Sequence, residues 1–212
     1  MLRAGNDVDH LLAKAAEAAS AGRPEDARRF VRRAVSVDPD HPTAQLHWAV
    51  ELADSPHLAR YHLRRAAQLG EGDPAIEYQV ACVLLELGDV DGARHLARRA
   101  HRHIEGEFRH LPGLVNLAGR LAHADGQDAV AEQALGIAFS MEPDMAWHGR
   151  TLAQFLISQE RPAEALRVVR AALRHTPEDP GLLQIARVAL RYSPDDPGLR
   201  SMVERLRAVA VV

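Results

Sequence analysis

Small and apolar residues recur along this chain at a spacing typical of α-helices. Five times, an alanine is followed four positions later by an apolar residue and three positions after that by another alanine. Residues three and four apart share one face of a helix, and small side chains on that face let a second helix axis approach closely. Each copy therefore predicts a closely packed helix. The copies are Ala27/Val31/Ala34, Ala59/Leu63/Ala66, Ala93/Ala97/Ala100, Ala131/Leu135/Ala138 and Ala165/Val169/Ala172.

A further small residue precedes each of these helices. In four copies it stands 12 positions before the first patterned alanine, and in the second copy it stands 10 positions before. The patterned alanines themselves begin at intervals of 32, 34, 38 and 34 residues. These spacings predict a row of helix–turn–helix repeats, with a shorter inter-helix turn in the second copy. The preceding small residues are Ala15, Ala49, Ala81, Gly119 and Ala153.

The 38-residue interval is longer than the others. Its extra residues fall within the segment from His101 to His110. Either the helix before it continues by one turn, or a longer loop forms here. Gly106 favours a helix end followed by a loop, because glycine is the common residue just after a helix.

The repeat resembles the tetratricopeptide repeat over about residues 8–192. Its small residues, turns and prolines match this family, whereas the family's early tryptophan and first-helix tyrosine are mostly replaced by leucine, valine or alanine. The resemblance implies an all-α, right-handed superhelical solenoid that forms a single domain over residues 1–212. The expected repeats are at about 8–41, 42–73, 74–107, 112–145, 146–179 and 180–210. The last one is atypical, with a first helix over Gly181–Tyr192 and a capping helix over Pro197–Ala210.

Composition fits a globular protein, with 47% hydrophobic and 26% charged residues. The net charge of −3 does not favour nucleic acid as the main partner. Cys82 is the single cysteine, which excludes an internal disulfide, and we expect it to be a packing residue. The first residues carry no apolar signal core, and no apolar run is long enough to span a bilayer. We therefore expect a cytoplasmic protein without membrane insertion.

No catalytic motif is present. The sequence lacks a phosphate loop, a dinucleotide fingerprint, a nucleophile elbow and the zinc-protease spacing. The densest group of histidines is His95, His101, His103 and His110. A helical metal site needs ligands three or four residues apart, and His101 and His103 are two apart. We expect neither enzymatic activity nor a cofactor or metal ion.

The family resemblance implies that the first helices line a concave groove and that the second helices form the outer surface. Projection of each first helix by its period then predicts that the groove is apolar in its first half and polar to cationic in its second half. Asparagine and glutamine can bond peptide amides, and arginine can bind a carboxylate. The groove would suit a protein or peptide segment with an acidic side chain or a free C-terminus, and homodimerisation is an alternative for its apolar half. The predicted partner-binding residues are Leu46, Val50, Tyr78, Asn116, Arg120, His123, Trp147, Arg150 and Gln154.

Arginine pairs recur in phase on the second helices, at Arg32-Arg33, Arg64-Arg65 and Arg98-Arg99. One interpretation is a solvated outer surface whose long side chains cover apolar groups. Another is a docking site for an acidic partner or for RNA. We favour a non-enzymatic scaffold that binds proteins. The alternative is a regulatory module that contacts RNA or a transcription complex through these pairs.

Overall fold

The computed structural model describes the backbone of residues 2–191 and the side chains of residues 7–188 and 191. All regular elements in this range are α-helices, so the predicted all-α class is confirmed. The expected capping helix over Pro197–Ala210 lies outside the described residues. Backbone contacts divide the chain into two compact units, Met1–Phe108 (unit 1) and Arg109–Val212 (unit 2).

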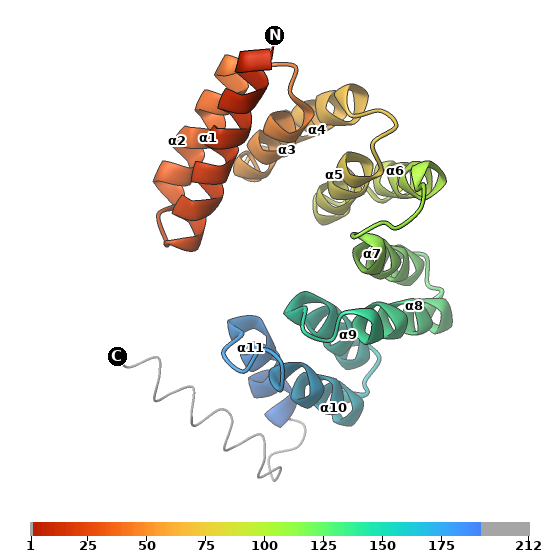
Figure 1. The fold of residues 1–212 in the computed structure, drawn as a ribbon. Helices are drawn as coiled ribbons and strands as arrows, with labels where there is room; N and C mark the ends of the chain where they lie inside the picture. Colours follow the sequence, from red (N-terminus) through yellow and green to blue (C-terminus); the bar gives the residue numbers. More distant parts are fainter. Residues whose placement is uncertain (1, 192–212) are drawn as a thin grey trace. The chain divides into compact units, whose positions relative to one another are not determined.

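Unit 1 consists of three helical hairpins (Figure 1). In each hairpin a first helix packs against the second helix that follows it. The second helices α2, α4 and α6 lie on the outer side of the row that the hairpins of unit 1 form in Figure 1. The hairpins are α1 (Leu2–Ser20) with α2 (Pro24–Val37), α3 (Pro42–Glu51) with α4 (Pro56–Leu69), and α5 (Pro74–Glu86) with α6 (Val90–His103).

Unit 2 continues the same alternation of first and second helices. Its elements are α7 (Leu111–Ala124), α8 (Asp128–Met141), α9 (Ala146–Ser158), α10 (Pro162–Leu173) and α11 (Pro180–Leu190). Helix α9 is central, because it contacts α7, α8, α10 and α11. The first helices α7, α9 and α11 are therefore neighbours within this unit.

Local sequence explains where the helices begin and where the chain turns. Seven of the described helices carry a proline in the first turn, where its missing N–H is not needed. Gly126 in the α7–α8 turn has a φ of +72°, a left-handed conformation that suits glycine. In the α9–α10 turn the corresponding conformation is adopted by Glu160, with a φ of +57°. The turn geometry is thus retained even where the glycine is missing.

The patterned residues of the five copies belong to the core. All fifteen members of the five copies are buried, and none is more than 8% exposed. The preceding residues Ala15, Ala49, Ala81 and Ala153 are buried as well. A Cβ atom added at Gly119 would lie 2.9 Å from Leu135 Cγ on α8. At this position α7 and α8 are thus too close for any residue but glycine to fit without a shift of its neighbours.

Of the two predictions made from irregular repeat spacings, the structure contradicts one and confirms the other. The second repeat does not have a shorter turn, so that prediction is wrong: residues 52–55 separate α3 from α4, whereas three residues separate the helices of the other hairpins. Helix α3 itself is short, with 10 residues. At the 38-residue interval, α6 ends at His103 and α7 begins at Leu111. The loop favoured by Gly106 is therefore confirmed.

In two hairpins of unit 1, a buried polar side chain at an equivalent position of the first helix forms hydrogen bonds to the second helix. Glu77 is 0% exposed and accepts hydrogen bonds from Arg99 Nη2 at 2.7 Å and His103 Nδ1 at 2.8 Å. Gln45 is 2% exposed, donates to the Pro39 carbonyl at 2.6 Å and lies 2.6 Å from His62 Nδ1. Each stands four residues before the small residue of its helix. Hydrogen bonds to the second helix offset the cost of burying these groups.

The close approach of α7 and α8 predicts opposite effects for two glycine substitutions in one hairpin. Gly119→Ala should lower the free energy of unfolding by about 1 kcal/mol, because overpacking outweighs the gain in helix propensity. Gly136→Ala should raise it by up to about 1 kcal/mol, since an added Cβ meets no atom within 4 Å. Urea unfolding followed by circular dichroism measures both. Equal effects of the two substitutions would contradict the close packing at Gly119.

Candidate functional site

The first helices of unit 2 bring two of the predicted residues into contact. Arg120 on α7 lies over the ring of Trp147 on α9, with 5.6 Å from the guanidinium carbon to the ring centroid. This distance is within the range of a cation–π interaction. Both side chains are half-buried. The contact joins two successive first helices of the unit.

Asn116 lies one helical turn before Arg120 on α7 and is 0% exposed. Neither its amide nitrogen nor its carbonyl oxygen has a hydrogen-bond partner among the described residues. A buried polar group without a partner costs about 1–3 kcal/mol. This residue was predicted to face an open groove, and that prediction is wrong in one respect, because the side chain is buried. It nevertheless offers a complete peptide-like donor and acceptor.

Arg150 reaches from α9 to the beginning of α11. Its Nε lies 3.8 Å from Asp179 Oδ1, and its side chain passes so close to Gly181 that an added Cβ would lie 2.7 Å from Nη1. Asp179 also accepts a hydrogen bond from the backbone N–H of Leu182 at 2.8 Å, as a helix cap does. Asp179 and Gly181 were not predicted as partners of Arg150, because the proline that follows Asp179 indicates only a helix start there.

The other two predicted residues of unit 2 differ from each other. His123 Nδ1 lies 2.7 Å from Asp128 Oδ1, and its ring contacts Phe155 edge-on. It therefore stabilises the α7–α8 hairpin. Gln154 on α9 is exposed and can contact a partner.

The three predicted residues of unit 1 are not equivalent. Leu46 is only 4% exposed and belongs to the core, so its prediction as a groove residue is wrong. Helix α3 contacts α2 and α5 as well as α4, so a position that projects away from its hairpin partner α4 can still be covered. Val50 is 49% exposed and Tyr78 is half-buried, so both can contact a partner.

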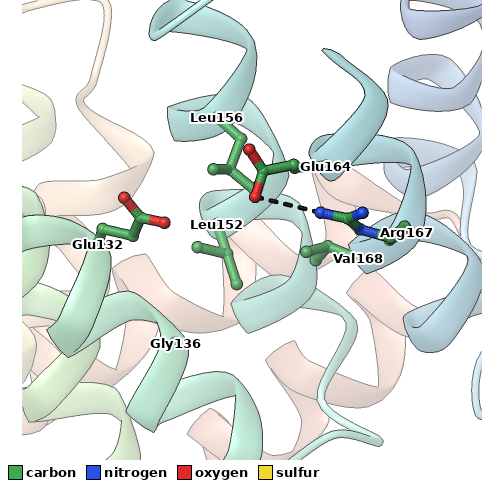
Figure 2. A pocket seen from close by; sticks show the side chains of 7 residues that line it. All are labelled: Glu132, Gly136, Leu152, Leu156, Glu164, Arg167 and Val168. Carbon is green, nitrogen blue, oxygen red and sulfur yellow. Dashed lines mark ion pairs between the residues drawn. The ribbon is translucent and has the colours of Figure 1, made fainter. Parts of the chain in front are cut away.

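A shallow pocket of about 270 Å³ lies between α8, α9 and α10 (Figure 2). Leu152, Leu156 and Val168 form its apolar lining, while Glu132 and Glu164 stand at its edge. Arg161 donates hydrogen bonds of 2.6 and 2.8 Å to each of these two carboxylates. These bonds hold the pKa of both carboxyl groups below the usual value. The charged edge of the pocket is thus already paired within the protein.

Metal binding and membrane insertion were considered for the part of the chain that the structure describes. No three histidine, cysteine or carboxylate side chains within residues 2–191 gather in a way that could hold a metal ion. His103, from the histidine-rich segment, is bonded to Glu77. In the same range, no helix combines the length and apolar character needed to cross a bilayer.

Solved structures with similar folds give the structural class. A thermophilic tetratricopeptide-repeat protein of Thermus thermophilus, TTC0263, superposes with a TM-score of 0.73 at 20% identity, covering 86% of this chain and 98% of that one. The type IV pilus biogenesis factor PilW gives a TM-score of 0.71 at 14% identity, with 95% and 92% covered. PilF of Pseudomonas aeruginosa gives 0.63 at 14% identity, with 96% and 90% covered.

This chain has the tetratricopeptide-repeat fold. The resemblance inferred from the spacing of small residues is therefore confirmed for the fold. No family model and no curated protein matches the sequence, which agrees with the loss of the large residues of the tetratricopeptide motif. The tetratricopeptide-repeat fold is typical of scaffolds that bind other proteins.

His148, beside Trp147, makes the stability of unit 2 depend on pH. It is 2% exposed, and burial lowers its pKa below 6.5, although Glu142 at 3.3 Å partly opposes this. The unfolded chain therefore binds a proton at a higher pH than the folded chain does. The contribution of neutral His148 is complete above pH 6.5 and is lost as pH falls from 6.5 through the lowered pKa.

We expect the wild type to lose stability between pH 7.5 and 5.5, and His148→Gln to lose less. The difference should be up to about 1.4 kcal/mol for each unit by which the pKa is lowered. Urea unfolding at both pH values measures it. His47 and His62, whose pKa values burial also lowers, remain in both proteins and cancel in the comparison. An identical pH dependence of the two proteins would contradict this assignment.

Proposed function

We propose that the protein is a non-enzymatic scaffold that binds an extended protein segment on the first helices of unit 2. The observation that carries this proposal is the buried, unpartnered amide of Asn116 one turn from Arg120. A peptide backbone presents the donor and acceptor that this amide lacks. Binding a peptide there requires a small movement of the side chains that cover Asn116.

Cations on the first helices α7 and α9 define the chemistry of the partner. Arg120 and Arg150 are both half-buried, and a guanidinium can bind a carboxylate through two parallel hydrogen bonds. Trp147 beneath Arg120 adds an apolar surface. The predicted partner is therefore a segment with an acidic side chain or a C-terminal carboxylate. Exposed Gln154 extends this surface along α9.

The carboxylate clamp of some tetratricopeptide-repeat proteins supports the proposal only in part. That clamp combines lysine with asparagine, and here its lysines have no counterpart. The shared feature is an asparagine and a cation on the same helical face. For this chain we propose that arginines bind acidic side chains or a C-terminal carboxylate. The partners of clamp-containing proteins are not transferred to it.

The test uses a peptide library displayed with free C-termini. We expect the wild type to select peptides rich in aspartate or glutamate, or with a shared C-terminal residue. The variant Asn116→Ala with Arg120→Gln should bind these peptides at least about tenfold more weakly, because it removes two hydrogen-bonding groups. Asn116→Ala alone should keep or raise the thermal stability, since the lost amide has no partner in the protein.

A matched control separates this effect from a general loss of polar groups. Gln133→Ala with Arg174→Gln makes the same types of change at two exposed positions of unit 2. This control should bind the selected peptides as the wild type does. Unchanged affinity of the Asn116→Ala, Arg120→Gln variant, in a folded protein, would overturn the proposal. Selected peptides with a neutralised C-terminus show whether an acidic side chain or the terminal carboxylate is recognised. Neutralisation abolishes binding only if the terminal carboxylate is the group that the protein recognises.

A further inference from the structure

The second helices of unit 1 concentrate positive charge. Helix α4 contains three arginines and no carboxylate. Helices α2 and α6 contain four arginines each, and their carboxylates, Glu25, Asp26 and Asp91, are confined to the first turn. Beyond that first turn, each of the three helices presents cations without acidic neighbours on the same helix.

Two of the paired arginines are used inside their own hairpins. Arg65 forms an ion pair with Asp40 and donates to the Pro39 carbonyl at 3.2 Å. Arg99 lies 2.7 Å from the buried carboxylate of Glu77 and 3.3 Å from Glu71. Each therefore ties a second helix to the residues at or just before the start of its first helix. These two side chains have a structural role.

The arginine that precedes each of these positions is different. The side chains of Arg32, Arg64 and Arg98 are exposed and make no hydrogen bond or ion pair with any described part of the chain. Each stands five residues after the first buried alanine of its helix, so the three occupy equivalent places in successive hairpins. Arg28 and Arg102, four residues away on α2 and α6, are also exposed and extend the same face by one turn. We call these five side chains the arginine row.

We propose that the arginine row is a docking surface for an acidic segment of another protein. Exposed guanidinium groups without internal partners can bind carboxylates through paired hydrogen bonds. Its residues belong to unit 1, whereas those of the proposed peptide site belong to unit 2. The partner class is a segment rich in glutamate or aspartate, which the local concentration of cations complements.

The scarcity of exposed aromatic side chains favours an acidic protein segment over RNA. Among the tyrosine, tryptophan and phenylalanine side chains of α2, α4 and α6, Tyr61 is the exposed one, at 56%. Binding of single-stranded RNA normally relies on several aromatic platforms for base stacking. A short acidic segment can bind through ion pairs with the arginine row and needs no aromatic side chains.

Fluorescence anisotropy with a labelled ten-residue polyglutamate peptide tests the proposal. The same measurement is made with a labelled ten-nucleotide polyuridine RNA. We expect the wild type to bind the peptide more tightly than the RNA at about 50 mM salt. The variant Arg32→Gln, Arg64→Gln, Arg98→Gln should bind the peptide roughly tenfold more weakly, since three surface ion pairs are lost.

The control changes the net charge equally in unit 2. Arg174→Gln, Arg187→Gln and Arg191→Gln replace three exposed arginines there, and this control should bind the peptide within about twofold of the wild type. An absence of peptide binding, tighter binding of the RNA, or an equal loss in both triple variants would overturn the proposal. So would a wild-type dimer that only the first triple variant converts to a monomer, because a second copy would then cover the row.

Discussion

The close approach of paired helices at small side chains is the constraint on which the structure depends. Within each hairpin, the first helix contributes a buried alanine or glycine and the second helix contributes buried alanines. Burial of many small side chains replaces the large aromatic core that is missing in this chain, which has only 4% aromatic residues. Close packing tolerates little change in volume. The positions of the candidate site residues on α7 and α9 follow from this contact.

Much of the fold could be predicted from the sequence because small residues recur in register. The shortening of the second repeat could not be assigned correctly, because a reduced spacing between Ala49 and Ala59 fits either a shorter turn or a shorter helix. The structure shortens α3. Helical projection gave the side of the helix on which Leu46 and Asn116 lie, but the depth of burial depends on neighbouring elements. The helical period of 3.6 residues shows which residues share one face of a helix, but it does not show which neighbouring helices cover that face.

Polar groups in this protein divide into those satisfied inside a hairpin and those left for other molecules. Glu77, Gln45 and His123 have partners in the hairpins that contain them. Sequence alone could not separate Arg98 from Arg99, since both belong to the same pair. Only the structure gives one of them a buried carboxylate and leaves the other exposed. The contrast between satisfied and unsatisfied groups, more than charge itself, identifies the candidate surfaces.

Hydrogen–deuterium exchange of an Ala153→Leu variant tests the central claim most directly. Ala153 on α9 is 0% exposed, and α9 contacts every other helix described in unit 2. If close packing at small residues holds the hairpin together, leucine should lower the protection of amides in α9 and α10 by about tenfold or more. Amides of unit 1 serve as the internal reference. Unchanged protection throughout α9 and α10 would contradict the account.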